Sequence, residues 1–453
     1  MRLSAEFRGV HWLVHALTIK SVAVTLLLLA LLSCVVAYAQ QVIPETPAGK
    51  AFGAWLDAVN SGDRAKIENY KANVNPMESV DVLMEIGKDS GGFDLISIED
   101  NERLSITFRV KERTTSRMGI GHVQVSDSEH PIVQAFELRP VPPGAVLENT
   151  KLEASDRNRV INAVIENLNE FYVYPEIAKK MANDLRDRQK KGEYDGITSG
   201  YALGGVLTKE LQDVSHDRHL RVSYSPIRLP PEEQKPNAEQ DAQFKKMMER
   251  TNCAFQKVEI LPRNIGYLKF NAFLDPTFCG ATVVAAMNFL AHVDAIIFDL
   301  RENGGGDPKM VAMVSSYLFD KPTHLNDLYN RKEDSTTQYW TLPYVPGAIL
   351  ADKPAFVLTS KATFSGAEEF TYNLKNLKRA TIVGETTGGG AHPVMGHRID
   401  DHFMVGVPFA RALNPISKTN WEGIGVEPDV PTKSADALDK ATELAASKLP
   451  VQQ

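Results

Sequence analysis

Short apolar runs alternate with longer amphipathic runs through the second half of the sequence, and this alternation constrains the fold more than any other feature. Short apolar runs are typical of buried strands, and the runs between them are long enough for helices. Strands that alternate with helices of this length indicate a layered α/β domain. The expected strands are Ile265–Phe270, Ala295–Leu300, Ala355–Leu358, Ala380–Val383 and His402–Phe409, and the expected helices are Thr282–His292, Lys309–Phe319 and Gly366–Lys378.

The chain has 453 residues, which is too many for one hydrophobic core, so we expect a multidomain protein with α+β and α/β parts. Residues 45–143 place helical spacing before several alternating segments, which predicts a small N-terminal α+β domain. This order resembles the nuclear-transport-factor-like cone. Residues 150–225 predict a helical module, residues 226–256 a charged connection, and residues 257–435 the α/β domain.

Residues 1–39 predict a secretory signal peptide. Basic residues precede an almost wholly apolar run, Val22–Val36, and Ala37–Ala39 matches the small-x-small cleavage pattern. Cleavage after Ala39 implies a periplasmic or secreted protein. Two alternatives remain: the apolar run stays uncut as a membrane anchor, or Cys34, in a lipoprotein-like box, carries a lipid. Contact with a membrane is expected only through this signal or anchor.

Charge and cysteine content narrow the range of partners and compartments. The formal net charge is −7 and no run of Lys or Arg is present, which argues against a nucleic-acid partner. Removal of the leader leaves Cys253 and Cys279. Two cysteines in an exported chain either form a disulfide or remain as free buried thiols.

Ser365 lies where a predicted strand turns into a predicted helix. A hydroxyl at such a position points to solvent, and the first N–H groups of the helix lack helical partners, so they can hold an anion. An acyl-transfer nucleophile needs both properties. The same residues also fit a helix-capping box formed by Ser365 and Glu368. The local sequence is compatible with either interpretation.

Three glycine-rich turns are found in the same half of the chain. The first, Asp299–Gly306, follows a buried strand, and its glycines let backbone N–H groups approach a substrate oxygen. This turn lacks the Lys-Ser/Thr of a P-loop and the spacing of a Rossmann fingerprint, so no cofactor is expected. The other two turns are Gly384–Pro393 and Trp421–Val430.

Four sequence blocks, in this order, resemble the tail-specific (C-terminal-processing) serine peptidases and their relatives, the tricorn protease core and interphotoreceptor retinoid-binding protein. The blocks are Asp217–Leu220, Asp299–Gly305, Phe364–Glu368 and Gly423–Asp429. The resemblance implies that residues 257–435 form a peptidase catalytic domain with a crotonase- or ClpP-like α/β fold. It also implies peptide or protein substrates, and it leaves oligomerisation open.

The resemblance makes Ser365 the nucleophile. The implied oxyanion donors are the N–H of Gly366 and one N–H from the turn at Gly304 and Gly305. Bacterial tail-specific enzymes use a lysine as the base, but Gly389 stands at the matching position here.

The tricorn-like branch uses a histidine base and an orienting glutamate, which match His219 and Glu422. Arg218 stands where those relatives place a serine beside the histidine. His392, in the same glycine-rich turn as Gly389, either lines the substrate cleft or has a structural role.

His216 and His219 could bind a metal ion from one helical face, but no third ligand is near in sequence, so no metal site is expected. The predicted function is an exported serine peptidase with a Ser nucleophile, a His general base and a glycine-rich oxyanion turn. The alternative is a non-catalytic carrier of an apolar ligand on the same fold. An acyl-CoA enzyme of the same fold class is disfavoured because the chain carries an export signal.

Overall fold

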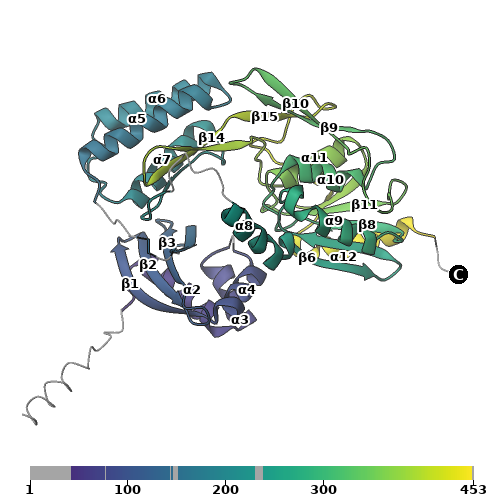
Figure 1. Cartoon of the computed structure of the whole chain (residues 1–453), viewed down its shortest axis with the longest axis horizontal. Helices are drawn as coiled ribbons and strands as arrows, with labels where there is room; N and C mark the ends of the chain where they lie inside the picture. The colour runs from purple at the N-terminus through teal and green to yellow at the C-terminus, as the bar shows by residue number, and fades with distance from the viewer. Residues whose placement is uncertain (1–41, 77, 143, 146–150, 230–237, 451–453) are drawn as a thin grey trace, which may run out of the picture. The chain divides into compact units, whose positions relative to one another are not determined.

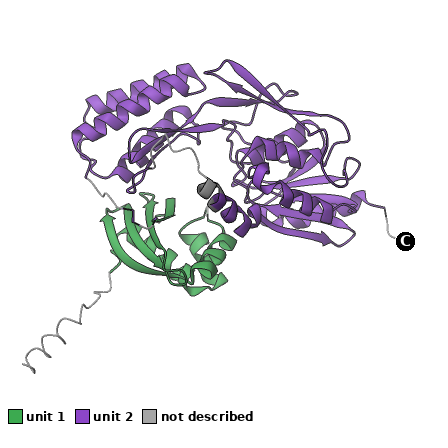
Figure 2. Cartoon of the chain, in the orientation of Figure 1, with its two compact units in different colours: residues 1–141 green, residues 142–453 purple. Residues whose placement is uncertain are grey.

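The structure, a computed structural model, describes residues 42–76, 78–142, 144–145, 151–229 and 238–450. The predicted signal peptide, the lipoprotein-like box and part of the charged connection lie outside these residues. The chain divides into two compact units, residues 1–141 and 142–453 (Figure 2). Among the described residues, no helix combines the length and the apolar character that crossing a membrane requires.

In the first unit, three helices precede a four-stranded antiparallel sheet whose strands follow one another in sequence order (Figure 1). Phe52 and Trp55 of the first helix pack on Phe108 at the centre of the sheet, and all three are fully buried. The predicted order of helices before strands is confirmed, while the cone-like resemblance stays a prediction. The elements are α2 (Pro47–Ser61), α3 (Arg64–Asn73), α4 (Val80–Ser90), β1 (Phe93–Asn101), β2 (Ser105–Glu112), β3 (Met118–Val125) and β4 (Val133–Pro140).

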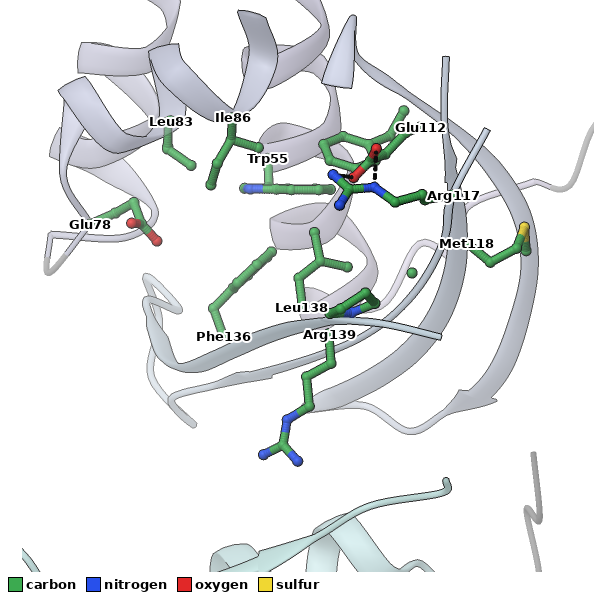
Figure 3. A pocket seen from close by; sticks show the side chains of 13 residues that line it. Trp55, Glu78, Leu83, Ile86, Glu112, Arg117, Met118, Phe136, Leu138 and Arg139 are labelled. Carbon is green, nitrogen blue, oxygen red and sulfur yellow. Dashed lines mark hydrogen bonds and ion pairs between the residues drawn. The ribbon is translucent and has the colours of Figure 1, made fainter. Parts of the chain in front are cut away.

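The first unit contains a pocket of about 390 Å³, partly open to solvent, between its helices and its sheet (Figure 3). Trp55, Leu83 and Phe136 are among the apolar residues that line it. Arg117 donates two hydrogen bonds to Glu112 at one edge, through Nε and Nη2, each 2.9 Å long. The unit therefore surrounds a largely apolar space with a charged pair at its border.

A six-stranded sheet forms the centre of the second unit (Figure 1). Its strand order is β16-β12-β11-β8-β7-β6, and all neighbouring strands are parallel except β6 and β7. Every residue of β8 and β11 is buried, as expected for parallel strands that are covered on both faces. The strands are β6 (Phe255–Leu261), β7 (Ile265–Phe270), β8 (Ala295–Asp299), β11 (Ala355–Thr359), β12 (Ala380–Gly384) and β16 (Val430–Pro431).

Helices cover both faces of this sheet. One face carries α9 (Pro276–Phe289), α10 (Pro308–Ser316) and α11 (Gly366–Asn376), whose apolar residues share one buried cluster with the strands. The other face packs against alanines of α12 (Ala437–Lys448). Because α12 completes the core, the α/β domain extends beyond its predicted end at residue 435.

The helical module is not continuous in sequence, which corrects the predicted range of 150–225. Its helices pack on a three-stranded antiparallel sheet with the order β13-β14-β5, and two of these strands come from residues after Ser365. Phe403, Val405 and Val407 of β14 are fully buried in the module's core. The elements are α5 (Ala154–Phe171), α6 (Pro175–Lys190), α7 (Gly200–Ser215), β5 (Arg221–Tyr224), β13 (Val394–Arg398) and β14 (Phe403–Pro408).

A further antiparallel sheet and several short elements complete the second unit. The sheet has the order β10-β9-β15. The elements are α8 (Ala238–Arg250), η1 (Asn252–Ala254), β9 (His324–Asn330), β10 (Ser335–Trp340), β15 (Ala410–Leu413) and η2 (Ser434–Asp436).

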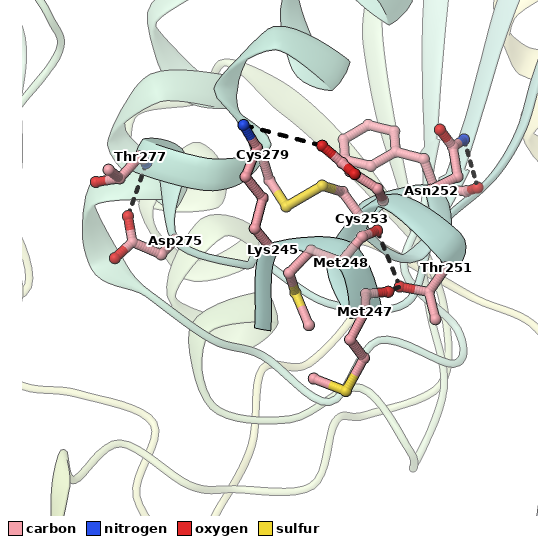
Figure 4. Close-up of a disulfide and its surroundings, with 11 residues drawn as sticks. Lys245, Met247, Met248, Thr251, Asn252, Cys253, Asp275, Thr277 and Cys279 are labelled. Carbon is pink, nitrogen blue, oxygen red and sulfur yellow. Dashed lines mark hydrogen bonds and ion pairs between the residues drawn. A yellow bond between two sulfur atoms is a disulfide. The ribbon is translucent and has the colours of Figure 1, made fainter. Parts of the chain in front are cut away.

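Cys253 and Cys279 form a disulfide, which selects between the two alternatives that the sequence left open (Figure 4). The bond joins η1 to α9 across a sequence separation of 26 residues. Both cysteines belong to the main buried cluster of the α/β domain. The disulfide therefore ties the start of this domain to one of its covering helices.

Candidate active site

Ser365 lies at the N-cap of α11, directly after the turn that follows β11. Its backbone has φ 52° and ψ −120°, a conformation that non-glycine residues rarely adopt and that is typical of functional positions. The turn is held by the N–H of Phe364, which donates to the carbonyl of Asn303, and by the hydroxyl of Thr363, which donates to the carbonyl of Leu300. The serine turn and the first glycine turn are thus bonded into one structure.

Backbone N–H groups of the first glycine turn differ in their availability. The N–H of Gly304 donates to the carbonyl of Asn271 at 3.1 Å, and the N–H of Gly305 donates to Oδ1 of Asn303 at 2.9 Å. The expectation that one of these two groups would face an oxyanion is therefore corrected, because both already have partners.

The N–H groups of Gly306 and Gly366 make no hydrogen bond within the described residues. A Cβ atom placed on Gly366 would lie only 2.9 Å from the Gly306 nitrogen, so the two backbone segments are in close contact. Gly306 and Gly366 are therefore the glycine N–H groups beside Ser365 that remain free to bind an anion.

The Glu368 carboxylate connects the serine turn to the second glycine turn. Its Oε2 accepts the N–H groups of Ser365 at 2.9 Å and Gly390 at 2.8 Å, and its Oε1 accepts the N–H of Gly389 at 2.6 Å. The hydroxyl of Thr387 also donates to Oε1. Burial raises the pKa of Glu368, while these four donors favour its ionised form. The predicted capping box of Ser365 and Glu368 is present, and Glu368 also holds the second glycine turn beside Ser365.

The structure explains why glycine suits position 389, where bacterial tail-specific enzymes have a lysine. Its φ is 82°, and an added Cβ would lie 3.1 Å from backbone atoms of Gly423 and Gly425. Its N–H is bonded to Glu368 and its carbonyl accepts the N–H of Gly423. A lysine here would be strained and crowded by backbone, so this turn is not built to present a side chain.

His219 is positioned by a turn between α7 and β5. Its ring packs on Phe364, the residue before Ser365, with ring centroids 4.7 Å apart. A Cβ on Gly390 would lie 2.6 Å from Cε1 of His219, which places the histidine against the second glycine turn. The structure therefore places His219 beside the serine turn. No hydrogen bond joins His219 to Ser365 within the described residues.

Arg218 does not play the part of the serine that tricorn-like enzymes have beside the histidine. Its Nη1 donates to the carbonyl of Gly388 at 3.0 Å, and its guanidinium lies 5.3 Å from the centroid of the Phe364 ring. Arg218 therefore fastens the histidine turn to the second glycine turn.

Asp217, His392 and Glu422 form a buried polar cluster behind His219. Nδ1 of His392 lies 2.7 Å from Oδ2 of Asp217 and 3.4 Å from Oε2 of Glu422. Oδ1 of Asp217 accepts the backbone N–H of His219 at 3.0 Å and lies 3.6 Å from its Nδ1. Glu422, expected to orient His219, therefore contacts His392 instead. His392 is 3% exposed, so it belongs to this cluster and does not line an open cleft.

Charges in the cluster divide unequally between its two carboxyl groups. Burial acts to raise the pKa of Asp217, but hydrogen bonds and charge from His219 and His392 outweigh it and hold the pKa below its usual range. Burial, and then the charge of Asp217, raise the pKa of Glu422 to about 8. At neutral pH the cluster thus holds an ionised Asp217 and a largely protonated Glu422.

Donor atoms of Asp217, His392 and Glu422 all lie within 4.8 Å of one another, a spacing that a metal ion could bridge. His216 and His219, which were considered as a metal-binding pair on one helical face and not adopted, do not share such a face, because α7 ends at Ser215 and His216 is its exposed C-cap. The sequence left Asp217, the first residue of the Asp217–Leu220 block, open as either a turn residue or a partner for a histidine, and the structure places it in contact with both His219 and His392.

Two family models match consecutive parts of the chain. Peptidase family S41 matches residues 264–432, and the N-terminal domain of peptidase S41 in eukaryotic IRBP matches residues 154–262. The first segment contains every strand of the six-stranded sheet except β6, and the second contains the three helices of the helical module.

Individual relatives match over shorter segments. A chloroplastic carboxyl-terminal-processing peptidase of Arabidopsis thaliana is 27% identical over 39% of this chain and 33% of its own length. A protein of Streptomyces coelicolor named as a tricorn protease homologue is 27% identical over 35% of this chain and 12% of its own length. The chain therefore spans a third or less of the length of these relatives.

Among solved structures, the photosystem II D1 C-terminal processing protease matches 62% of this chain and 94% of its own, with a TM-score of 0.40 and 16% identity. The two family models and the order of the four motifs together identify residues 264–432 as a serine-type peptidase domain of the tail-specific superfamily, peptidase family S41, preceded by a module of the kind found in interphotoreceptor retinoid-binding protein.

Proposed function

We propose that the protein is an exported serine peptidase that hydrolyses peptide bonds with Ser365 as nucleophile and His219 as general base. One observation carries this proposal. Ser365 is held at φ 52° at the start of α11, beside the N–H groups of Gly306 and Gly366, which make no hydrogen bond within the described residues. A hydroxyl next to two free, fixed N–H donors is the arrangement that acyl transfer requires.

The proposed reaction has two halves. Oγ of Ser365 attacks the carbonyl carbon of the substrate while Nε2 of His219 takes the hydroxyl proton. The negative oxygen of the tetrahedral intermediate is held by the N–H groups of Gly306 and Gly366, each worth a few kcal/mol of barrier. His219 then gives its proton to the departing amine, the C–N bond breaks, and a water molecule, deprotonated by His219, releases the acyl group from Ser365.

Export is proposed from the N-terminal leader. The disulfide between Cys253 and Cys279 supports it, because such bonds form and persist in oxidising compartments. The proposed substrates are peptide or protein chains, which are the substrates of the serine-type peptidases to which the chain belongs.

A fluorophosphonate probe applied to the purified chain tests the proposal. We expect covalent labelling at Ser365, hydrolysis of an unfolded protein such as casein, and loss of both in Ser365→Ala. His219→Ala should label on the order of 10³-fold more slowly, the scale typical of losing a general base.

Ser360→Ala is the matched control. Ser360 lies on the same turn, but its hydroxyl donates to the carbonyl of Arg301, so we expect labelling to persist in that variant. Labelling that survives Ser365→Ala would refute the assignment of the nucleophile. A wild-type protein without labelling or turnover, but with saturable binding of a fatty acid, would favour the apolar-ligand carrier.

A further inference from the structure

We propose that Asp217 orients the catalytic histidine in this protein and that His392 and Tyr172 are positioning residues that hold Asp217 for this task. The inference rests on the proposed peptidase function and deepens it. In the tricorn-like arrangement that the sequence suggested, a serine beside the histidine and a glutamate share this role. Here Arg218 replaces the serine and points toward Gly388.

Asp217 divides its two oxygens between the two histidines. Oδ1 accepts the backbone N–H of His219 at 3.0 Å and lies 3.6 Å from Nδ1 of the same ring. Oδ2 lies 2.7 Å from Nδ1 of His392 and accepts the hydroxyl of Tyr172 at 3.2 Å. One carboxylate therefore faces the histidine base on one side and is anchored by two donors on the other.

Because Asp217 is buried, its stability as a carboxylate depends on these contacts. Asp217 is 1% exposed, and a buried carboxylate is stable only when charged or hydrogen-bonding groups compensate for its lost hydration. Nδ1 of His219 is buried and has no hydrogen-bond partner within 3.5 Å among the described residues. Asp217 Oδ1 is the acceptor at its side, so a small movement of the ring completes the bond.

The position of Asp217 also fixes where the proton of His219 resides. A carboxylate next to Nδ1 keeps the proton on that nitrogen and leaves Nε2 free to accept the proton of Ser365. When the histidine becomes charged during the reaction, the ionised Asp217 stabilises it.

His392 acts through Asp217 and does not transfer the proton itself. Its Nδ1 lies between Oδ2 of Asp217 and Oε2 of Glu422, so a proton on Nδ1 has an acceptor on both sides. Its Nε2 is buried without a partner in the described part of the chain. Nδ1 of His392 is then a fixed donor to Asp217.

Glu422 is poorly suited to replace Asp217. Its Oε2 accepts the N–H of Ala391, and its nearest histidine nitrogen is that of His392 at 3.4 Å. Its raised pKa, caused by burial and by the charge of Asp217, leaves it largely protonated at neutral pH. The groups that surround Asp217 are thus His219, His392, Tyr172 and Glu422, and Asp217 is the ionised carboxylate next to His219.

The test compares Asp217→Asn with Glu422→Gln in the full chain, because each substitution replaces a carboxyl group by an amide of the same shape. For Asp217→Asn we expect kcat/KM to fall on the order of 10³-fold. The acid limb of the pH profile, which reports ionisation of His219, should move down by about one pH unit. Glu422→Gln should lose less than about 10-fold and keep the acid limb in place. A larger loss or a larger shift in Glu422→Gln would overturn the inference.

Two further measurements keep the test decisive if Asp217→Asn does not fold. His392→Gln, whose amide can still donate, should retain more activity than His392→Ala, and Tyr172→Phe should lose less than either. In wild-type protein, proton NMR should show a low-field Nδ1 proton that disappears in His219→Ala; its absence would refute the contact with Asp217. Wild-type protein that fails to react with fluorophosphonate would instead refute the proposed function.

Discussion

Two adjacent buried glutamates on α11 should respond in opposite ways to the same substitution. Glu368 is 0% exposed and its carboxylate accepts four hydrogen bonds, three from backbone N–H groups and one from Thr387. Glu369 is 4% exposed, and its Oε1 has no hydrogen-bond partner among the described residues. Burial raises the pKa of Glu369 to about 8, so it is largely neutral at pH 7.

The size of each effect follows from these contacts. In Glu368→Gln, one oxygen becomes an NH₂ group and meets two donors, which leaves two buried donors unsatisfied. Each such group costs about 1–3 kcal/mol, so we expect a loss of about 2–6 kcal/mol in the free energy of unfolding. Glu369→Gln exchanges one neutral group for another of equal shape, and we expect a change below about 1 kcal/mol at pH 7.

Urea unfolding at pH 7, followed by near-ultraviolet circular dichroism, measures both variants against the wild type. A second comparison at pH 9 sharpens the test. Glu369 holds its proton more tightly in the folded than in the unfolded chain, so the stability that this group confers falls as pH rises from about 4.5 through 8. Glu369→Gln should therefore become more stable than the wild type at pH 9. Equal losses of unfolding free energy in the two variants at pH 7 would refute the different roles assigned to Glu368 and Glu369.

Three further predictions concern the turn, the cluster and the disulfide. Gly389→Ala should lower the free energy of unfolding by about 1–3 kcal/mol more than Gly423→Ala, because both residues have positive φ but only a Cβ at Gly389 would lie 3.1 Å from backbone atoms. Equal losses of stability in thermal unfolding would contradict this prediction. The Tm of Glu422→Gln should rise relative to that of the wild type as pH increases from about 4.5 to 8, since the pKa of Glu422 in the folded wild type is about 8. A Tm difference that does not change with pH would disprove this titration. Replacing Cys253 and Cys279 by serine should lower the unfolding free energy by about 3 kcal/mol in urea, and an unchanged midpoint would show that the bond contributes no stability.

The α/β layer and the position of Ser365 at the start of a helix were predictable because their signals are local. Apolar runs such as Ala355–Leu358 identify buried strands, and Ser365 with Glu368 identifies the start of a helix. The helix beginning at Pro276 starts earlier than its apolar pattern indicated, because the Asp275 side chain caps it by accepting the N–H of Thr277.

Long-range contacts were not predictable from the sequence. The pairing of β5 with β14 joins segments far apart in the chain, and neither strand signals its partner. The contact between Asp217 and His392 spans 175 residues. The availability of the Gly306 N–H likewise depends on Asn271 and Asn303, which occupy the N–H groups of the two preceding glycines.

The pairing of β5 with β14 has a consequence for the timing of activity. His219 precedes β5, while β14 is translated after Ser365, so the base is fixed only once residues 403–408 have joined the module. Arg218 gains its carbonyl partner at Gly388 only when the second glycine turn has formed. Under the proposed mechanism, a partly synthesised or partly unfolded chain therefore has a nucleophile without an aligned base. The proposed peptidase activity would then arise only when folding is complete, so the chain would not cut other unfolded chains before that point.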